Sequence, residues 1–348
     1  MKVYFLADTH LGMKGDNEIW LKECYEYYIK SLIPYLKKNV QPDDILIHCG
    51  DVFDNRSNIG IQTINVAITL FEKFSEIFND IRIIVGNHDM MRKHDTKMTS
   101  VNILKYIPNV KIYYKPCVET IADKSVLFVP WMENINEQKS LLQKYTVDYV
   151  FGHLEIGGAV INNKGVMMSV DKSISKSEFK KAEVFAGHIH IRQDIKNVHY
   201  VGSPYHKDRG DIGNTKGITV LDMNSGEREF VENKFSPIFI EESIYNILDN
   251  TIEELKEKWK HNIIDLLVDT NDITKCDFES LREELINIVM EFKIKTIGDL
   301  KTSSVNIDTP TEIKTSEEYL NDYLEHKDLT DINKRLVKEL FIRIKNKL

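Results

Sequence analysis

The feature that most constrains the fold is a series of short apolar runs, rich in β-branched residues, along the first 235 residues. The runs are KVYFLAD, DILIHCGD, IRIIVGNHD, SVLFVPW, YVFGHLE, EVFAGHIH, HYVGSP and GITVLDM. A run that is apolar at nearly every position is typical of a strand buried on both faces. Amphipathic helical segments are predicted at 17–39 and 60–80, between the first three runs. Strand–helix–strand units of this kind predict an α/β fold with mixed sheets and helices on their faces. The later strands follow one another more closely, which favours a second, more antiparallel sheet.

The chain has 348 residues, enough for two or three domains. Residues 1–235 carry balanced charges, so the whole net charge of −8 falls on residues 236–348. We expect a small α+β cap domain over 236–298, with helices near 251–261 and 277–293. Residues 299–316 have the composition of a linker, and 317–348 predict C-terminal helices with one apolar stripe. The first 235 residues would not repel a phosphate backbone, whereas the acidic region after them would.

Composition also bears on the compartment. No apolar run approaches the roughly 18 residues of a membrane span. The apolar run at the N-terminus is too short for a secretory signal peptide. The four cysteines form no CxxC pair, which argues against a disulfide framework or a zinc knuckle. We therefore expect a protein of a reducing compartment, the cytoplasm.

Polar side chains gather where the apolar runs end. Because binding sites of open α/β sheets form beyond the carboxyl ends of the strands, clusters on five strand ends can converge on one crevice. The clusters are Asp8 and His10; Asp51 and Asp54; Asn87, His88 and Asp89; His153; and His188 and His190.

These clusters have the chemistry of a metal site. Aspartate, asparagine and histidine without thiolate form a ligand set suited to Mn²⁺, Fe or Zn²⁺. A single carboxylate at Asp51 could bridge two ions, as two-metal hydrolases require. A glycine precedes each of Asp51, Asn87, His153 and His188, and it would let the backbone turn tightly near the ions.

The ordered motifs DTH, GDVFD, GNHD, GH and GHIH resemble the five-motif signature of the calcineurin-like metallophosphoesterases. Within that group GDVFD, VPWM and YVGSP resemble the SbcD nuclease family, which includes phage recombination endonuclease subunits and the nuclease of the double-strand-break repair complex. The resemblance is strong over residues 1–235, which carry the motifs. Over the remaining residues it is limited to the order of the predicted segments. It implies a β-sandwich of two mixed sheets flanked by helices in a nuclease domain over 1–235.

The resemblance also implies roles for individual residues. One ion would be held by Asp8, His10, Asp51 and His190. A second would be held by Asp51, Asn87, His153 and His188, and Mn²⁺ is the expected metal for both. His88 would be the catalytic histidine that protonates or stabilises the leaving 3′ oxygen. Asp54 or Asp89 would orient His88, although some members carry a histidine at the position of Asp54.

Partners follow from charge and from the same resemblance. Phosphate contacts come from lysine and arginine on loops beside a site. The candidates for DNA binding are Arg56, Arg92, Lys93, Lys207 and Arg209. Because residues 1–235 are neutral overall, we expect weak DNA binding by the chain alone. The resemblance implies an SMC-like coiled-coil ATPase bound by the C-terminal helix, and a homodimer through helices at 60–79 and 97–106. It places the chain in the cytoplasm, that of the host if a phage encodes it.

The sequence thus predicts a two-metal DNA nuclease, with 3′→5′ exonuclease activity on duplex ends and endonuclease activity on single strands. It would act in DNA recombination, repair or replication. One alternative is a phosphatase or cyclic-nucleotide phosphodiesterase on the same fold. Protein phosphatases of the group carry arginine after the second motif and end the third in glutamate, whereas Asn55 and Asp89 stand here. A second alternative is a catalytically inert scaffold that binds DNA ends.

Overall fold

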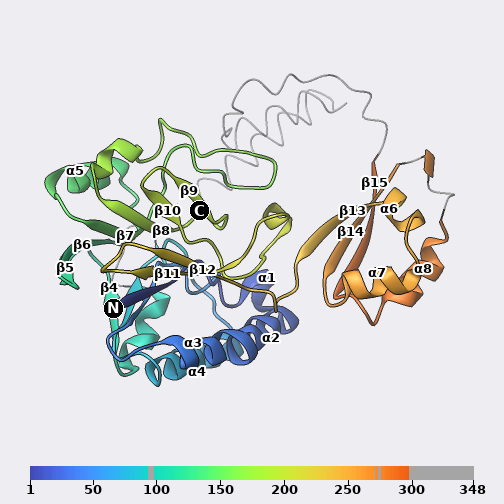
Figure 1. Cartoon of the computed structure of the whole chain (residues 1–348), viewed down its shortest axis with the longest axis horizontal. Coiled ribbons are helices and arrows are strands. Elements are labelled where there is room, and N and C mark those ends of the chain that lie inside the picture. Colours follow the sequence, from blue (N-terminus) through green and yellow to red (C-terminus); the bar gives the residue numbers. More distant parts are fainter. Residues whose placement is uncertain (93–97, 270, 273–275, 298–348) are drawn as a thin grey trace, which may run out of the picture. The chain divides into compact units, whose positions relative to one another are not determined.

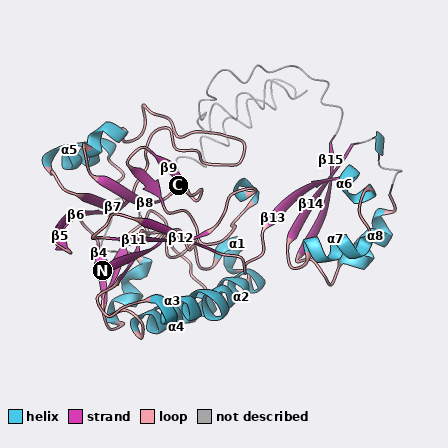
Figure 2. Ribbon diagram, in the orientation of Figure 1, coloured by secondary structure: helices cyan, strands magenta, loops and turns pink. Residues whose placement is uncertain are grey.

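The computed structural model describes residues 1–92, 98–269, 271–272 and 276–297. Two six-stranded sheets lie face to face in the first 235 residues, with helices on their outer sides (Figures 1 and 2). The first sheet has the order β12-β11-β1-β2-β3-β4. Its strands are β1 (Lys2–Leu6), β2 (Ile45–His48), β3 (Ile81–Ile84), β4 (Val110–Tyr113), β11 (Gly217–Asp222) and β12 (Arg228–Glu232).

Strands β1 to β4 of this sheet run parallel. Strand β11 is antiparallel to β1, and β12 is antiparallel to β11, so β12 runs in the same direction as β1. The crossovers between the parallel strands are helical, as predicted. The first contains α1 (Met13–Asp16), α2 (Glu18–Tyr27), a π-helical turn (Tyr28–Leu32) and α3 (Ile33–Asn39); the second contains α4 (Ile61–Ser75). A short 3₁₀ helix, Ser100–Tyr106, lies between β3 and β4.

The second sheet has the order β5-β6-β7-β8-β10-β9. Its strands are β5 (Cys117–Ile121), β6 (Lys124–Val129), β7 (Tyr149–His153), β8 (Glu183–Gly187), β9 (Gln193–Ile195) and β10 (Val198–Tyr200). Only the β5–β6 and β9–β10 pairs are antiparallel. The expectation of a more antiparallel second sheet is therefore wrong. Helix α5 (Ile135–Lys144) and a long loop carry the chain back across the sheet, so that β6, β7 and β8 run parallel.

Alternating side chains of the strands build separate core layers. Tyr4 and Leu6 of β1 pack with the apolar faces of α2 to α4, whereas Val3 and Phe5 pack between the two sheets. There Phe5 stacks on Phe185 of β8, with ring centroids 4.6 Å apart. A third cluster lies between the outer face of the second sheet and α5. The two-sheet sandwich with flanking helices is confirmed.

A third sheet follows, with the order β13-β14-β15 and all strands parallel. It contains β13 (Phe239–Ser243), α6 (Ile244–Leu248), α7 (Ile252–Trp259), β14 (Ile263–Asp269), α8 (Phe278–Leu285) and β15 (Glu291–Ile297). The predicted helix over 277–293 ends early, because the alternating sequence EFKIKTI pairs with β14 as a strand. This sheet belongs to the same compact unit as the first 235 residues. The cap-domain boundaries at 236 and 298 stay a prediction.

The predicted linker over 299–316 and the C-terminal helices over 317–348 lie outside the described residues. Among the helices that the structure describes, none is long and apolar enough to span a membrane.

Candidate metal centre

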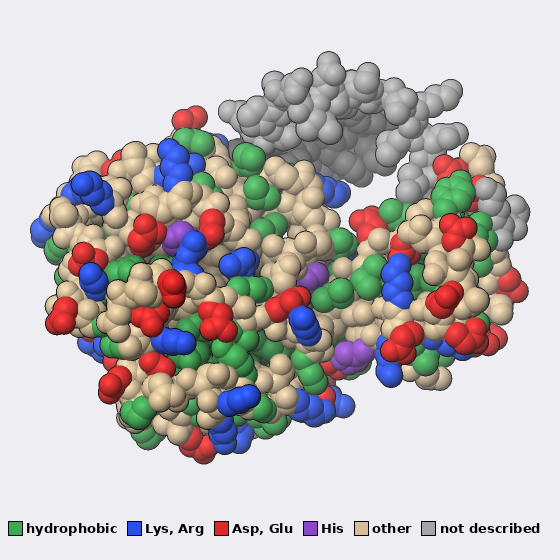
Figure 3. Space-filling model, viewed as in Figure 1, with side chains coloured by type: hydrophobic (Ala, Val, Ile, Leu, Met, Phe, Trp, Pro, Cys, Tyr) green, Lys and Arg blue, Asp and Glu red, His purple; other side chains and the backbone are tan. Residues whose placement is uncertain are grey.

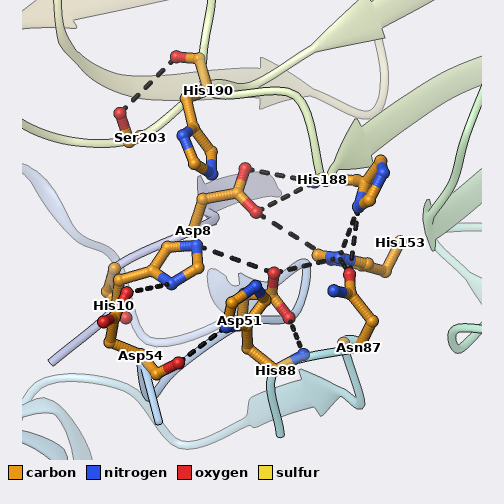
Figure 4. Close-up of polar contacts among 12 residues, drawn as sticks. Asp8, His10, Asp51, Asp54, Asn87, His88, His153, His188, His190 and Ser203 are labelled. Atoms are coloured by element: carbon orange, nitrogen blue, oxygen red, sulfur yellow. Dashed lines mark hydrogen bonds and ion pairs between the residues drawn. The ribbon is translucent and has the colours of Figure 1, made fainter. Parts of the chain in front are cut away.

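The polar strand ends of both sheets meet at one edge of the sandwich. Because β1, β2 and β3 are parallel, their carboxyl ends bring the first three clusters together. The parallel strands β7 and β8 of the second sheet bring His153 and the GHIH turn to the same place. Figure 4 shows these side chains pointing toward one another from the two sheets.

Four of the predicted ligands have a strained backbone. The φ angles are 51° at Asp8, 43° at His10, 56° at Asp51 and 92° at His188. Non-glycine residues adopt such angles at a cost that the surrounding structure must meet, and they cluster at functional sites. The expected tight turns are thus made largely by the ligands themselves. Gly86 serves another purpose, because a Cβ there would lie 2.2 Å from Asp51 Oδ1.

Asp51, His153 and His188 form one possible metal site, with ligand atoms within 4.8 Å of one another. Asn87 belongs with them, since its Oδ1 lies 2.9 Å from His153 Nε2 and 3.0 Å from His188 Nδ1. His153 Nδ1 lies 2.8 Å from the carbonyl oxygen of Cys49 and donates to it. In the neutral ring that bond turns the lone pair of Nε2 toward Asn87 and Asp51.

Asp8, His10 and His190 form a second group of the same kind. The carboxylate of Asp8 accepts from the backbone N–H of His188 at 2.9 Å, which ties the two sheets together. His10 Nε2 lies 3.6 Å from Asp51 Oδ2, so Asp51 stands between the two groups. Neither ring nitrogen of His10 makes a hydrogen bond, although both are buried. Buried nitrogens that make no hydrogen bond although carboxylates lie close to them fit a place for a metal ion.

The electrostatics favour a cation at this place. Burial lowers the pKa of His188 to about 3 and holds those of His10 and His190 well below the usual range, so these rings keep their lone pairs. Burial raises the pKa of Asp8 to about 7. Although burial also opposes a charge on His153, the neighbouring Asp51 carboxylate raises the pKa of His153 to about 9. The donor set therefore fits divalent cations, because carboxylates and the neutral rings of His10, His188 and His190 face one space.

His88 lies beside both groups. Its ring Nδ1 is 2.6 Å from the backbone carbonyl oxygen of Asp54, and its backbone N–H donates to Asp51 Oδ1 at 2.7 Å. Because a carbonyl oxygen can only accept, Nδ1 carries the hydrogen and Nε2 is the nitrogen that can exchange a proton with a substrate. His88 also forms a group with His10 and Asp51 whose ligand atoms lie within 4.8 Å.

Comparison with known proteins agrees with this geometry. The family model of the calcineurin-like phosphoesterases matches residues 1–192, which include every strand-end cluster. The chain belongs to that family. Members use divalent metal ions, and the two ligand groups at Asp51 are where this phosphoesterase would hold them.

Three relatives extend the comparison. Exonuclease subunit 1 of Enterobacteria phage T4 is 27% identical over 327 residues, which cover 87% of this chain and 95% of that protein. A putative phosphoesterase of Invertebrate iridescent virus 3 is 25% identical over 67% of this chain and 65% of its own length. The DNA double-strand break repair protein Mre11 of Methanocaldococcus jannaschii is 28% identical over 27% of this chain and 25% of its own length. The predicted resemblance to the phosphoesterases and their SbcD branch is confirmed.

Asp89 contacts backbone groups of this phosphoesterase. Its buried carboxylate accepts the backbone N–H groups of Asp51 and Val52 at 2.9 Å, of Gly86 at 2.9 Å and of Phe53 at 3.3 Å. These bonds run to the backbone of the second and third motif loops, and the role of Asp89 in orienting His88 stays a prediction. Asp89 joins the two loops and holds Asp51 in its strained conformation. Asp54 contacts His88 through its backbone, while its carboxylate lies 3.0 Å from His10 Nδ1.

Lys207, predicted to bind DNA, lies inside the site. The residue is 9% exposed, and its Nζ is 3.5 Å from His190 Nε2 and 3.7 Å from Asp54 Oδ1. Its backbone N–H donates to Asp211 at 2.8 Å. It is thus a buried cation beside the ligand groups rather than part of a surface track.

The other DNA candidates divide. The guanidinium of Arg209 binds Asp265 with two nitrogens, one bond being Nη2 to Oδ1 at 2.7 Å, and its Nη2 lies 3.4 Å from Glu291. Arg209 therefore joins the first 235 residues to the third sheet, and its role as a DNA contact stays a prediction. Arg56 is half-buried and Arg92 exposed, whereas Lys93 lies outside the described residues. On the face seen in Figure 3, basic and acidic side chains of the first 235 residues are interspersed.

Sequence reasoning missed the layer that supports the ligands. Lys216 is 4% exposed, donates to the carbonyl oxygen of His190 at 2.6 Å and to Ser203 Oγ at 3.0 Å, and pairs with Asp211. The hydroxyl of Tyr205 donates to the carbonyl oxygen of Thr9, between two ligands of the first motif. No motif marks these residues, since only the fold brings them to the site.

Proposed function

We propose that this phosphoesterase is a two-metal nuclease that hydrolyses DNA phosphodiester bonds. The observation that carries the proposal is that two ligand groups meet at Asp51, with His88 beside both. DNA is the proposed substrate because the relative aligned over 95% of its length is named an exonuclease subunit, and another is named for double-strand break repair. We propose 3′→5′ action on duplex ends and endonuclease action on single strands, in recombination, repair or replication.

The proposed ligand sets are those of the sequence analysis, with Asp51 shared and Mn²⁺ as the metal. Divalent ions bound here would lower the pKa of water and neutralise charge on a phosphate. His88, whose Nδ1 donates to the Asp54 carbonyl oxygen, would present a protonated Nε2 to the leaving oxygen. The P–O3′ bond breaks as water adds to phosphorus, and the proton on Nε2 passes to the departing 3′ oxygen.

Lys207 would complete the site as a contact for the phosphate that is cleaved. Its ammonium lies between His190 and the Asp54 carboxylate, and so faces the place where a phosphate would enter. A buried cation needs no reorganisation when negative charge develops on a phosphate oxygen. Arg56 and Arg92 stay proposed contacts for the strand beyond the site.

Partners belong to the proposal as well. Exposed apolar side chains support a homodimer through 60–79 and 97–106, because Ile61 is 78% exposed and Tyr106 is 81% exposed. An SMC-like ATPase is proposed to bind the C-terminal helix, which lies outside the described residues.

The test is Mn²⁺-dependent digestion of a linear duplex labelled at one end, with wild type compared with His88→Ala. We expect wild type to shorten the duplex from its 3′ ends, and the variant to lose about 10²- to 10⁴-fold in rate while keeping its metal. Turnover of p-nitrophenyl phosphate or a cyclic nucleotide without digestion of DNA would instead indicate a phosphatase or phosphodiesterase. Inertness on all three, with metal bound, would indicate a scaffold unless the ATPase partner restores digestion.

A further inference from the structure

A cavity of about 400 Å³ lies beside the candidate metal centre. Its walls include Met90, Tyr114, Pro116, Pro130 and Trp131, and the charged residues that line it are Lys115, Glu133 and Glu137. A concave, mainly apolar cavity of this size with a few polar groups is typical of sites for small molecules or single chemical groups. None of the roles assigned above uses it.

Trp131 connects this cavity with the metal centre. Its backbone N–H donates to the carbonyl oxygen of Val85 at 2.9 Å, which fixes the residue at the end of β3. Its ring lies over His188, with centroids 4.9 Å apart and planes inclined by 30°, and its centroid is 6.0 Å from that of His153. One side chain is therefore both a wall of the cavity and a neighbour of two predicted metal ligands.

The walls suit a flat aromatic group. Tyr114 is held in place, because its hydroxyl donates to Asn102 Oδ1 at 2.6 Å. The ring of Trp131 supplies a second aromatic wall beside the one from Tyr114. Every nucleobase has a π face that stacks on such side chains. Lys115 lines the cavity together with Glu133 and Glu137, so the argument for a nucleobase depends on the aromatic walls and not on charge.

We infer that this cavity binds the nucleobase of a nucleotide whose phosphate enters the metal centre. The inference rests on the proposed nuclease function, and it adds the way in which the substrate is positioned. A base in the cavity has left the stack of its strand, and the cost of unstacking is smallest at frayed ends and in single strands. Because stacking depends little on the identity of the base, such a cavity selects exposed ends rather than a sequence.

The test measures binding of 2-aminopurine deoxyribonucleoside 5′-monophosphate to the Mn²⁺-loaded full chain, by quenching of the probe's fluorescence. Deoxyribose 5-phosphate, which lacks the base, serves as the competitor. Loss of one stacking contact weakens binding by roughly 5- to 150-fold, so we expect this loss for Trp131→Leu and near wild-type binding for Trp131→Phe. Tyr145→Ala, in a separate apolar cavity of about 250 Å³ beside α5, is the matched control and should bind like wild type.

Metal content and DNA digestion are measured on the same preparations. If Trp131→Leu loses metal, Tyr114→Leu repeats the test without altering the ring beside His188. Wild-type binding by a metal-replete variant of either residue would overturn the inference. Equal competition by deoxyribose 5-phosphate would overturn it too, because the base would then add nothing to binding. Quenching that requires Trp131 in a chain that digests no DNA would support the cavity while refuting the proposed nuclease.

Discussion

Two buried polar clusters lie next to each other in this phosphoesterase and differ in how their atoms are paired. In the cluster around Lys216, the ammonium contacts Asp211, Ser203 and the His190 carbonyl oxygen, so its charge and hydrogens are used. In the metal centre, neither ring nitrogen of His10 makes a hydrogen bond, although carboxylate oxygens of Asp54 and Asp51 lie 3.0 and 3.6 Å away, and several acids and imidazoles face one space. Burial is similar in the two clusters. The difference teaches that pairing, rather than burial, separates a supporting cluster from a binding site.

The largest effect should come from Asp51→Asn, which removes the carboxylate between the two ligand groups. Asn keeps the shape and an acceptor for the His88 N–H, so the fold should be retained. Activity should fall by more than the roughly 10²- to 10³-fold cost of one lost transition-state donor. Metal content by elemental analysis should fall with it, while the metal-free chain keeps its unfolding midpoint. Asp54→Asn changes a partly exposed carboxylate and should lose less activity and less metal than Asp51→Asn. Full metal content with full activity in Asp51→Asn would contradict the assignment.

Lys216→Met tests the paired cluster. It leaves the Asp211 carboxylate buried without its cation, which costs about 3–5 kcal/mol of unfolding free energy. The double variant with Asp211→Asn should recover part of that loss, because no unpaired charge remains. Lys256→Met breaks an exposed ion pair with Glu284 and should cost at most about 1 kcal/mol. Urea unfolding measures all three, and equal losses in the two single variants would remove the distinction between the clusters.

Lys207→Met tests the residue that lies between the clusters. If its ammonium contacts the phosphate that is cleaved, kcat should fall by about 10²-fold, the typical effect of losing one donor to developing charge. Binding of inorganic phosphate, measured by calorimetry, should weaken as well, whereas Lys207→Arg should keep part of both. Arg56→Ala, outside the ligand groups, should change DNA binding only a few-fold. A Lys207→Met enzyme with wild-type kcat would assign this residue to structure alone.

His206 gives the smallest effect, and it depends on pH. Its Nε2–H donates to the Asn214 carbonyl oxygen at 3.0 Å, and its Nδ1 accepts from the Phe239 N–H at 3.3 Å, so the paired ring is neutral. Burial lowers its pKa to about 4. Between pH 6.5 and 4 the unfolded chain binds a proton that the folded chain does not, so this stability is complete above pH 6.5 and is lost as pH falls.

The slope is at most about 1.4 kcal/mol per pH unit, and the whole shift corresponds to roughly 3 kcal/mol. His206→Gln cannot titrate, so its urea midpoint should fall less steeply than that of wild type between pH 6.5 and 4.5. Parallel slopes in the two proteins would show that His206 does not titrate in this range.

The sequence by itself determined the parts of this protein that depend on local order. Runs that are apolar at nearly every position are typical of strands buried on both faces, so the sequence predicted the strands. Together with the amphipathic segments between them, these runs also predicted the helical crossovers and the sandwich. The polar clusters followed because parallel strands end at a common edge, which brought Asp8, Asp51, Asn87, His153 and His188 together as predicted. The roles of these residues as ligands stay a prediction.

Tertiary structure decided everything that depends on residues distant in sequence. Asp89 and Arg209 carry charges next to motifs, yet one binds backbone N–H groups and the other binds a strand 56 positions away. Lys207 and Lys216 lie at the metal centre because the loop that follows β10 brings them to His190. Trp131 lies there because the segment after β6 binds the backbone at the end of β3. A charged residue looks the same in the sequence whether its side chain faces solvent or binds a buried partner. Only the fold determines which of these it meets, and therefore what the residue does.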